Sequence, residues 1–422
     1  MGAASQRTSR SGPPWPRRPT SKTIRAPSPN YGWVVLACLC CAGFARQGPA
    51  VATLSIFVEP LIREFGWSRT ALSGAVSVAG VMAALVAPPI GRILDRHGSR
   101  AVLSVAVLVN AAALALLSFT PSLLIFYLLY CIARMNWAAA FDLGIYGAIS
   151  KWFVARRALA TSIATMAQMA GLVAMPLIAQ FAIVHHGWRA GWLALGAVTL
   201  VVGFLPVWLF LTKEPEQPAR AGNPEPRYSR AEAVRTPAFW LLMLFTVLVY
   251  PVQAGVSLHQ APHLVERGLD ATTAALIVGS FSFMSGVATF VCGFLPRRVP
   301  LRFVLALVGV LLVAGVLLLK RVASPADGYL AVSLFGLGIG GVLTLLPLAW
   351  ADYFGRENYG AIRGLALSAQ VLAQAAGPLI SGLLRDFGGD YQLALSVFAV
   401  LSGLSVAAAL AARAPTLAAA RS

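Results

Sequence analysis

The chain has 422 residues, of which 58% are hydrophobic and only 11% are charged. A soluble protein of this length needs far more polar surface, so the composition excludes a soluble domain and indicates an integral membrane protein. The formal net charge of +18 at pH 7 is typical of nucleic-acid binding as well, and only the placement of the basic residues separates the two readings.

Residues 1–30 precede the first apolar run and are rich in Arg, Ser and Pro. A segment with so little apolar content cannot bury enough surface to fold, so we predict a disordered basic tail. No small-residue cleavage site follows it, which argues against a cleaved signal peptide.

Twelve apolar runs are long enough to cross a bilayer, which takes about 20 residues of helix. They predict transmembrane helices over residues 33–57, 69–90, 101–119, 122–149, 158–182, 190–211, 238–260, 272–295, 303–321, 328–351, 363–385 and 391–412. The predicted fold class is therefore an all-α integral membrane protein with twelve transmembrane helices.

Basic residues are concentrated in alternate loops. With the N-terminus inside, the predicted cytoplasmic segments hold about three quarters of the 33 Lys and Arg residues. This positive-inside bias predicts cytoplasmic termini in a plasma membrane, a bacterial inner membrane being expected. It accounts for the net charge without a nucleic-acid partner.

The segment between the second and third runs, Gly91 to Arg100, reads GRILDRHGSR. Four charges and two glycines do not belong in hydrocarbon, so we predict a tight, water-exposed hairpin over these ten residues. Asp95 is placed to accept hydrogen bonds from a neighbouring helix N-terminus, and Arg96 and Arg100 to pair with carboxylates across the cytoplasmic face.

The pattern Gly-x-x-x-Asp-Arg-x-Gly-x-Arg at this location resembles the signature loop of the major facilitator superfamily. The resemblance implies a transporter in which this loop is a gate that latches one access state. The gate residues would be Gly91, Asp95, Arg96, Gly98 and Arg100. The alternative is an ordinary basic hairpin.

The chain also repeats itself. The segment from Arg157 aligns with the segment from Arg363 at a constant offset, and Gly293 to Arg302 is a degraded copy of the hairpin that lacks the Asp. We therefore predict two parallel six-helix bundles, as in the major facilitator fold. The predicted parts are the tail 1–30, bundle 31–211, linker 212–236, bundle 237–412 and a cytoplasmic tail 413–422.

Three charged residues lie well inside predicted helices, away from the helix ends, and all are in the N-terminal half: Arg46, Arg134 and Asp142. A charge at the bilayer centre costs about 2.5–3.5 kcal/mol on insertion scales, so these side chains are expected to face protein or a water-filled cavity. Asp142 is the only carboxylate inside a predicted helix. It is a candidate for proton coupling, and a structural ion pair with an arginine is an equal alternative.

Uncharged polar residues line the same predicted helices in both halves. Gln370 and Gln374 share one helix face, and Gln168 is the repeat partner of Gln374. With Arg46, Arg134, Tyr250 and Gln253, they complete the predicted substrate-binding set. His259 is a second candidate for proton transfer, although an interfacial histidine is more often a satisfied polar residue.

No cofactor, metal site or enzyme activity is predicted. All five cysteines fall inside apolar helices, no Cys or His pair has metal-ligand spacing, and no nucleophile–base set is visible.

Three further stretches point to one branch of the superfamily: Tyr31-Gly32-Trp33, the run EPLIREFGWSRT, and the run LHQAPHLVERGLD. They resemble the bacterial monocarboxylate and oxalate–formate porters. That resemblance implies an organic anion moved with a proton or exchanged for another anion. The chain departs from the branch at Ala50, Ser285 and Thr289, where those porters carry charged residues, so Arg46 and Arg134 would have to hold the anion.

The leading functional hypothesis is a monomeric secondary or facilitative transporter of small monocarboxylate-type anions, coupled to protons and working by alternating access. Two alternatives stay open: an exporter of neutral or amphipathic metabolites, and a receptor or scaffold that keeps the fold without transport.

Overall fold

The structure is a computed structural model that describes residues 31–154, 156–212, 226–294 and 299–415. The predicted disordered tail 1–30 lies outside these residues, as do 213–225 of the linker and 416–422 of the C-terminal tail. Every secondary-structure element in the described ranges is a helix, in agreement with the predicted fold class.

The N-terminal half is built from α1 (Tyr31–Ala45), α2 (Val51–Phe65), α3 (Arg69–Leu117), α4 (Leu123–Ala138), α5 (Ala140–Trp152), α6 (Arg157–Val198), the π-helix η1 (Thr199–Phe204) and α7 (Leu205–Phe210). The C-terminal half comprises α9 (Pro237–Glu266), α10 (Ala271–Gly293), α11 (Leu301–Lys320), α12 (Pro325–Phe354), α13 (Tyr359–Gly388) and α14 (Gln392–Ala411). The short helix α8 (Arg230–Arg235) lies in the predicted linker.

Nine helical stretches of the described chain are long and apolar enough to cross a membrane. Two of them reverse direction once at a glycine and so cross twice. These are α3, which turns at Gly98, and the continuous stretch α6–η1–α7, which turns at Gly187. Together with the broken first span, α1 and α2, they make up the twelve predicted crossings.

The turn within α3 is much shorter than the predicted hairpin. Helical structure continues through Asp95, Arg96 and His97, and only Gly98 leaves it, at φ 79° and ψ 166°. The predicted hairpin is therefore present, but its turn is confined to Gly98 instead of extending over the ten residues. Charged residues end the membrane span but not the helix, because a helix can project into water, whereas the reversal itself needs a positive φ that glycine accommodates.

Two predicted helices are broken. The first span, predicted over 33–57, is interrupted between Ala45 and Val51, since Pro49 lacks a backbone N–H and disfavours helix at the residue before it. The fourth, predicted over 122–149, is interrupted at Ala139, where φ is −110° and ψ is −66°. No proline or glycine marks this second break.

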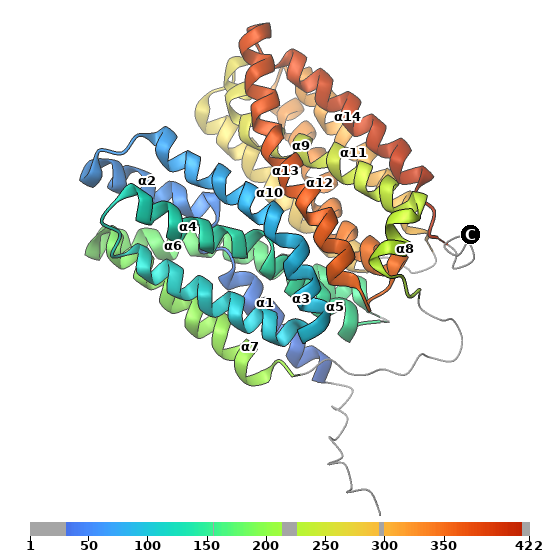
Figure 1. Ribbon diagram of the computed structural model, residues 1–422. Coiled ribbons are helices and arrows are strands. Elements are labelled where there is room, and N and C mark those ends of the chain that lie inside the picture. The colour runs from blue at the N-terminus through green and yellow to red at the C-terminus, as the bar shows by residue number, and fades with distance from the viewer. Residues whose placement is uncertain (1–30, 155, 213–225, 295–298, 416–422) are drawn as a thin grey trace, which may run out of the picture.

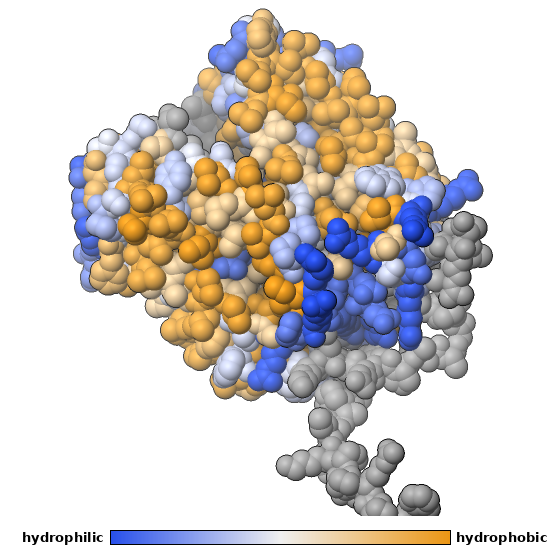
Figure 2. Space-filling model, in the orientation of Figure 1, coloured by the Kyte–Doolittle hydropathy of each residue, from blue (hydrophilic) through white to orange (hydrophobic). Residues whose placement is uncertain are grey.

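The two halves lie side by side along α3 and α13 and along α6 and α10 (Figure 1). We call the end where α1 begins and α14 ends the terminal face. Apolar side chains cover the flanks of the helices, and hydrophilic ones gather at the terminal face (Figure 2). This distribution fits a bundle whose flanks contact lipid.

Candidate functional site

The most buried charges form a cluster between the halves, centred on Asp142. Its carboxylate lies 3.7 Å from Arg46 Nη1 and 3.4 Å from Arg363 Nη2. The exposed fractions of these side chains are 9% for Asp142, 7% for Arg46 and 1% for Arg363. One carboxylate thus bridges an arginine of its own half and an arginine of the other.

The helix breaks position this cluster. Arg46 directly follows α1, and Asp142 occupies the first turn of α5. The break at Ala139 starts a new helix, so Asp142 lies in its first turn, where backbone N–H groups have no partner within the helix.

Each arginine of the cluster also donates to a glutamine. Arg46 Nη1 lies 2.7 Å from Gln168 Oε1, and Arg363 Nη2 lies 2.9 Å from Gln370 Oε1. Gln168 in turn donates to the Tyr146 hydroxyl at 3.2 Å. The structure therefore brings together four predicted site residues: Arg46, Asp142, Gln168 and Gln370.

Arg363 is the residue that sequence reasoning missed. It was placed at the cytoplasmic start of the eleventh helix, but α13 begins at Tyr359, so Arg363 lies within the buried part of the bundle. The prediction that all intramembrane charges belong to the N-terminal half was therefore wrong. The internal repeat contained the signal, because Arg363 aligns with Arg157.

The repeat partner Arg157 makes the matching contact. Its side chain pairs with Asp352 of α12 and donates to the Ser150 carbonyl oxygen at 3.1 Å. Each of the two repeated arginines thus reaches a carboxylate of the opposite half, Arg157 that of Asp352 and Arg363 that of Asp142. The two-fold character of the sequence is preserved in the ion pairs.

Arg134 is not among the ion-pair partners of Asp142, which are Arg46 and Arg363. Its guanidinium carbon lies 3.6 Å from the ring centroid of Trp137, and Arg46 lies over the same ring at 4.6 Å. Among the described residues Arg134 forms no ion pair, and its buried Nη1 has no hydrogen-bond partner.

Arg134, which shares the Trp137 ring with Arg46, brings the arginines here to three against one carboxylate, so two positive charges are left without a buried counter-charge among the described residues. An uncompensated charge in a low-dielectric site is costly, and an anionic ligand would relieve that cost.

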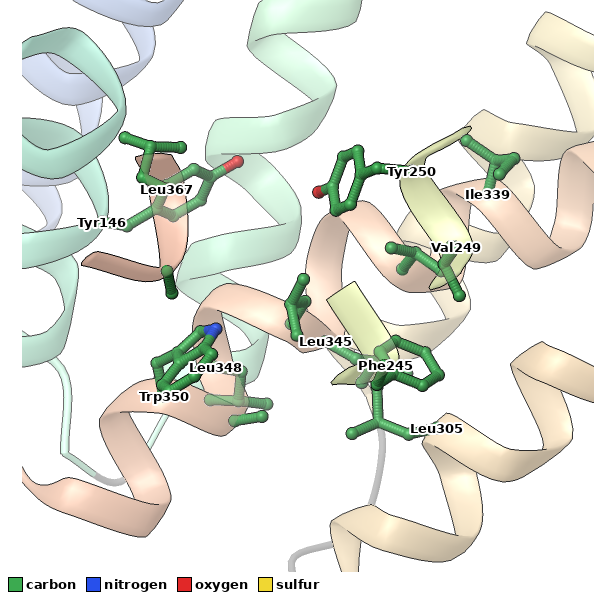
Figure 3. Packing of buried hydrophobic residues seen from close by; sticks show 14 of the residues in the cluster. Tyr146, Phe245, Val249, Tyr250, Leu305, Ile339, Leu345, Leu348, Trp350 and Leu367 are labelled. Atoms are coloured by element: carbon green, nitrogen blue, oxygen red, sulfur yellow. The ribbon is translucent and has the colours of Figure 1, made fainter. Parts of the chain in front are cut away.

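Two tyrosines from opposite halves complete the interface. Figure 3 shows Tyr146 of α5 and Tyr250 of α9 with their hydroxyl groups directed toward one another. Tyr146 shares a hydrogen bond with Thr165 at 3.0 Å, and Tyr250 is buried. Tyr250 therefore lies at the interface between the halves, opposite Tyr146.

The remaining predicted site residues lie apart from the cluster. Gln374 donates to Gln253 at 3.0 Å, which joins α13 to α9 within one half. His259 lies about 13 Å farther along α9 than Tyr250 and hydrogen-bonds the Tyr391 hydroxyl at 3.1 Å. Burial raises the pKa of Tyr391, so its phenol stays protonated beside the histidine.

The predicted gate shows the expected contact at Asp95. Its carboxylate accepts hydrogen bonds from the backbone N–H groups of Gly360 at 2.9 Å and Ala361 at 2.6 Å, at the N-terminus of α13. A Cβ on Gly91 would collide with the carbonyl oxygen of Gly360, so the close approach of α3 and α13 requires glycine.

The two gate arginines do not pair as predicted. Arg100 donates to the Trp208 carbonyl oxygen at 3.1 Å, within its own half. Arg96 is exposed, and no ion pair of Arg96 or Arg100 occurs among the described residues. Among the described residues, the predicted pairing of these two arginines with carboxylates across this face is not seen.

Further polar contacts join the halves along α3 and α13 and beside the terminal face. Ser368 donates to the Ala84 carbonyl oxygen at 2.5 Å, and Arg356 donates to that of Lys151 at 3.3 Å. With Asp95 and the two arginine–carboxylate pairs, they hold the halves together from the terminal face to the central cluster.

Comparison with known proteins identifies similar chains. The Major Facilitator Superfamily model matches residues 35–378 and 264–421. Human monocarboxylate transporter 11 is 31% identical over 91% of this chain and 85% of its own length. The uncharacterised MFS-type transporter YcxA of Bacillus subtilis is 24% identical over 84% of this chain and 88% of its own. The human organic anion transporter MFSD10 superposes with a TM-score of 0.68 at 17% identity, over 91% of this chain and all of that one.

Proposed function

The chain belongs to the major facilitator superfamily, and on this premise we propose that it carries small monocarboxylate-type organic anions by alternating access. It is a multi-pass membrane transporter rather than an enzyme, and its substrate is a small molecule. The proposal adds to this a monocarboxylate-type substrate, coupling to protons and alternating access.

The observation that carries the proposal is the excess of buried positive charge. Arg46 and Arg363 share Asp142, whereas Arg134 has no buried counter-charge among the described residues. A guanidinium binds a carboxylate through two parallel N–H···O hydrogen bonds, so Arg134 is the proposed anchor for the substrate. The names of the human relative and of MFSD10, a monocarboxylate and an organic anion transporter, agree with this class.

Asp142 is the proposed proton-coupling site. When its carboxylate is protonated, it no longer neutralises Arg363 of the opposite half, and the ionic bridge between the halves is weakened. Proton binding and separation of the halves are then linked through one residue. His259 is too far along α9 to take part directly and remains a candidate for a peripheral relay.

Alternating access would come from rocking of the bundles 31–211 and 237–412 about the central cluster. Asp95, Arg157 and Arg363 each contact the opposite half, and these contacts would have to break for the terminal face to open. We further propose that the terminal face is cytoplasmic, in a bacterial inner membrane, and that the transporter is a monomer.

Uptake of labelled monocarboxylates into proteoliposomes under an imposed pH gradient tests the proposal. Wild-type protein should concentrate at least one such acid, and Arg134→Gln should lower uptake at least tenfold because the carboxylate loses its guanidinium partner. Arg321→Gln removes an exposed arginine as the matched control and should retain wild-type uptake. No uptake across a broad panel of acids would overturn the substrate class.

A further inference from the structure

Trp137 has a position in the cluster that no functional role described so far accounts for. It lies in the last turn of α4, directly before the break at Ala139. The guanidinium carbons of Arg134 and Arg46 lie 3.6 Å and 4.6 Å from the centroid of its ring. Because both distances end at the same ring centroid, the guanidinium carbons of Arg134 and Arg46 can be no farther apart than the sum of the two distances.

Like charges at this separation repel, and the repulsion is strong where water is excluded. The negative face of an indole ring attracts a guanidinium, and the attraction strengthens when the cation is desolvated. One ring that contacts both cations thus offsets part of their repulsion and fixes where each can lie.

The ring is itself held in place. The Trp137 indole Nε1 donates to the side chain of Gln47 at 3.0 Å, and Gln47 is a buried residue of the break between α1 and α2. The Gln47 carbonyl oxygen accepts from Thr53 at 2.9 Å. Seven residues before Trp137 on α4, the Tyr130 hydroxyl donates to the Pro49 carbonyl oxygen at 3.1 Å. The broken segment and α4 therefore lock the orientation of the indole.

The two arginines differ in what else holds them. Arg46 is bound by Gln168 and paired with Asp142, so its guanidinium has two anchors besides Trp137. Arg134 has no hydrogen-bonded or ionic partner among the described residues, and the contact with Trp137 is the interaction that defines its place.

We propose that Trp137 is a positioning residue that sets the location of Arg134, relative to Arg46, for recognition of the substrate carboxylate. This rests on the proposed function, in which Arg134 is the anchor. Trp137 does not have to touch the substrate: it orients the group that does.

The test compares Trp137→Phe, which keeps an aromatic face but loses the Nε1–H donor, with Trp137→Leu, which removes the face. Trp137→Leu should raise the KM for uptake about tenfold, and Trp137→Phe should restore most of that loss, whereas the maximal rate per folded protein changes less. A purely structural role would lower the amount of folded protein and the maximal rate without this split. Trp240→Phe, at an exposed tryptophan of α9, is the matched control.

A second measurement does not depend on transport. Modification of Arg134 by phenylglyoxal, followed by peptide mass spectrometry of the full-length protein, reports how firmly its guanidinium is held. Labelling of Arg134 should increase in Trp137→Leu and return toward the wild-type level in Trp137→Phe. Unchanged labelling in Trp137→Leu, or an unchanged KM where the wild type transports, would overturn the proposal. Increased labelling together with no wild-type uptake of any acid would instead reject the proposed function and leave the positioning role in place.

Discussion

Among single residues, Asp142 links the two halves directly, because its carboxylate on α5 lies close to Arg46 of its own half and Arg363 of the other. Removing the charge of a buried carboxylate between two arginines leaves two desolvated cations close together. The two alternatives left open by the sequence, proton coupling and a structural ion pair, are compatible at this position.

Replacing Asp142 with Asn is expected to separate these two effects. The variant should lose concentrative uptake under a pH gradient and lose the dependence of uptake on external pH, since the amide does not titrate. In the wild type, raising the external pH should lower uptake. Proteoliposome uptake measured over a pH series checks this, and an Asp142→Asn protein with unaltered proton-driven accumulation would exclude the coupling role.

The structural contribution of Asp142 is expected in the stability of the same variant. Removing one partner of a buried ion pair costs about 3–5 kcal/mol, so Asp142→Asn should unfold at a clearly lower temperature in detergent. Adding Arg363→Gln removes one of the stranded cations and should recover part of the loss. If the double variant is less stable than the single one, the two residues are not coupled as described.

At the level of helices, the breaks in the first and fourth spans bring Arg46 and Asp142 next to each other in the middle of the bundle. Arg46 and Gln47 lie in the break that follows α1, and Asp142 follows the break between α4 and α5. An unbroken first helix would point Arg46 in a different direction, because each added helical residue rotates the side chains by about 100°.

Pro49→Ala tests this element. The variant regains a backbone N–H and can continue the helix through the break, which should redirect Arg46 and lower uptake about tenfold without lowering the unfolding temperature. Uptake kinetics and a thermal unfolding curve measured on one preparation check both parts. Normal uptake would show that the break is not needed for the site.

The contact between α3 and α13 is a second feature of this scale. Gly91→Ala places a methyl group against the Gly360 carbonyl oxygen, whereas Gly80→Ala on the same helix meets nothing closer than 4.0 Å. The first substitution should lower the free energy of unfolding by about 1–3 kcal/mol and the second should leave it unchanged. Thermal unfolding in detergent compares them, and equal stability of the two variants would contradict the close approach.

At the scale of the whole molecule, the two halves are joined by ion pairs that follow the internal repeat. Arg157 reaches Asp352, and Arg363 reaches Asp142, so each half supplies one arginine and one carboxylate. A rocking motion of the halves would have to break both pairs, and their strength would set the balance between the states.

Asp352→Asn is expected to shift that balance toward a state open at the terminal face, because Arg157 loses its charged partner in the opposite half. Spin labels at Arg92 and Glu357, both exposed, should report a longer distance in this variant by double electron–electron resonance. Asp386→Asn, at an exposed residue of α13, is the control. An unchanged distance distribution would argue that the Arg157–Asp352 pair does not hold this face closed.

The features that could be predicted from the sequence are those that follow from local composition. Long apolar runs predicted twelve crossings, the segment from Gly91 to Arg100 predicted the superfamily, and an internal offset predicted two related halves. These features depend on residues that are neighbours in the chain, and the bilayer allows few other solutions for them. Asp95 was predictable too, since a carboxylate beside a glycine-rich turn has few partners other than a helix N-terminus.

Which charged residues form ion pairs depends on the tertiary structure. Arg363 and Asp142 are 221 residues apart, and their pairing depends on how the two bundles pack. The same holds for the ring of Trp137 beneath Arg134 and Arg46, and for the breaks that set their depth. A buried charge shows in the sequence that it needs a partner, but the partner is chosen by the packing of helices, because desolvation acts on every neighbour in space and not only on those nearby in the chain.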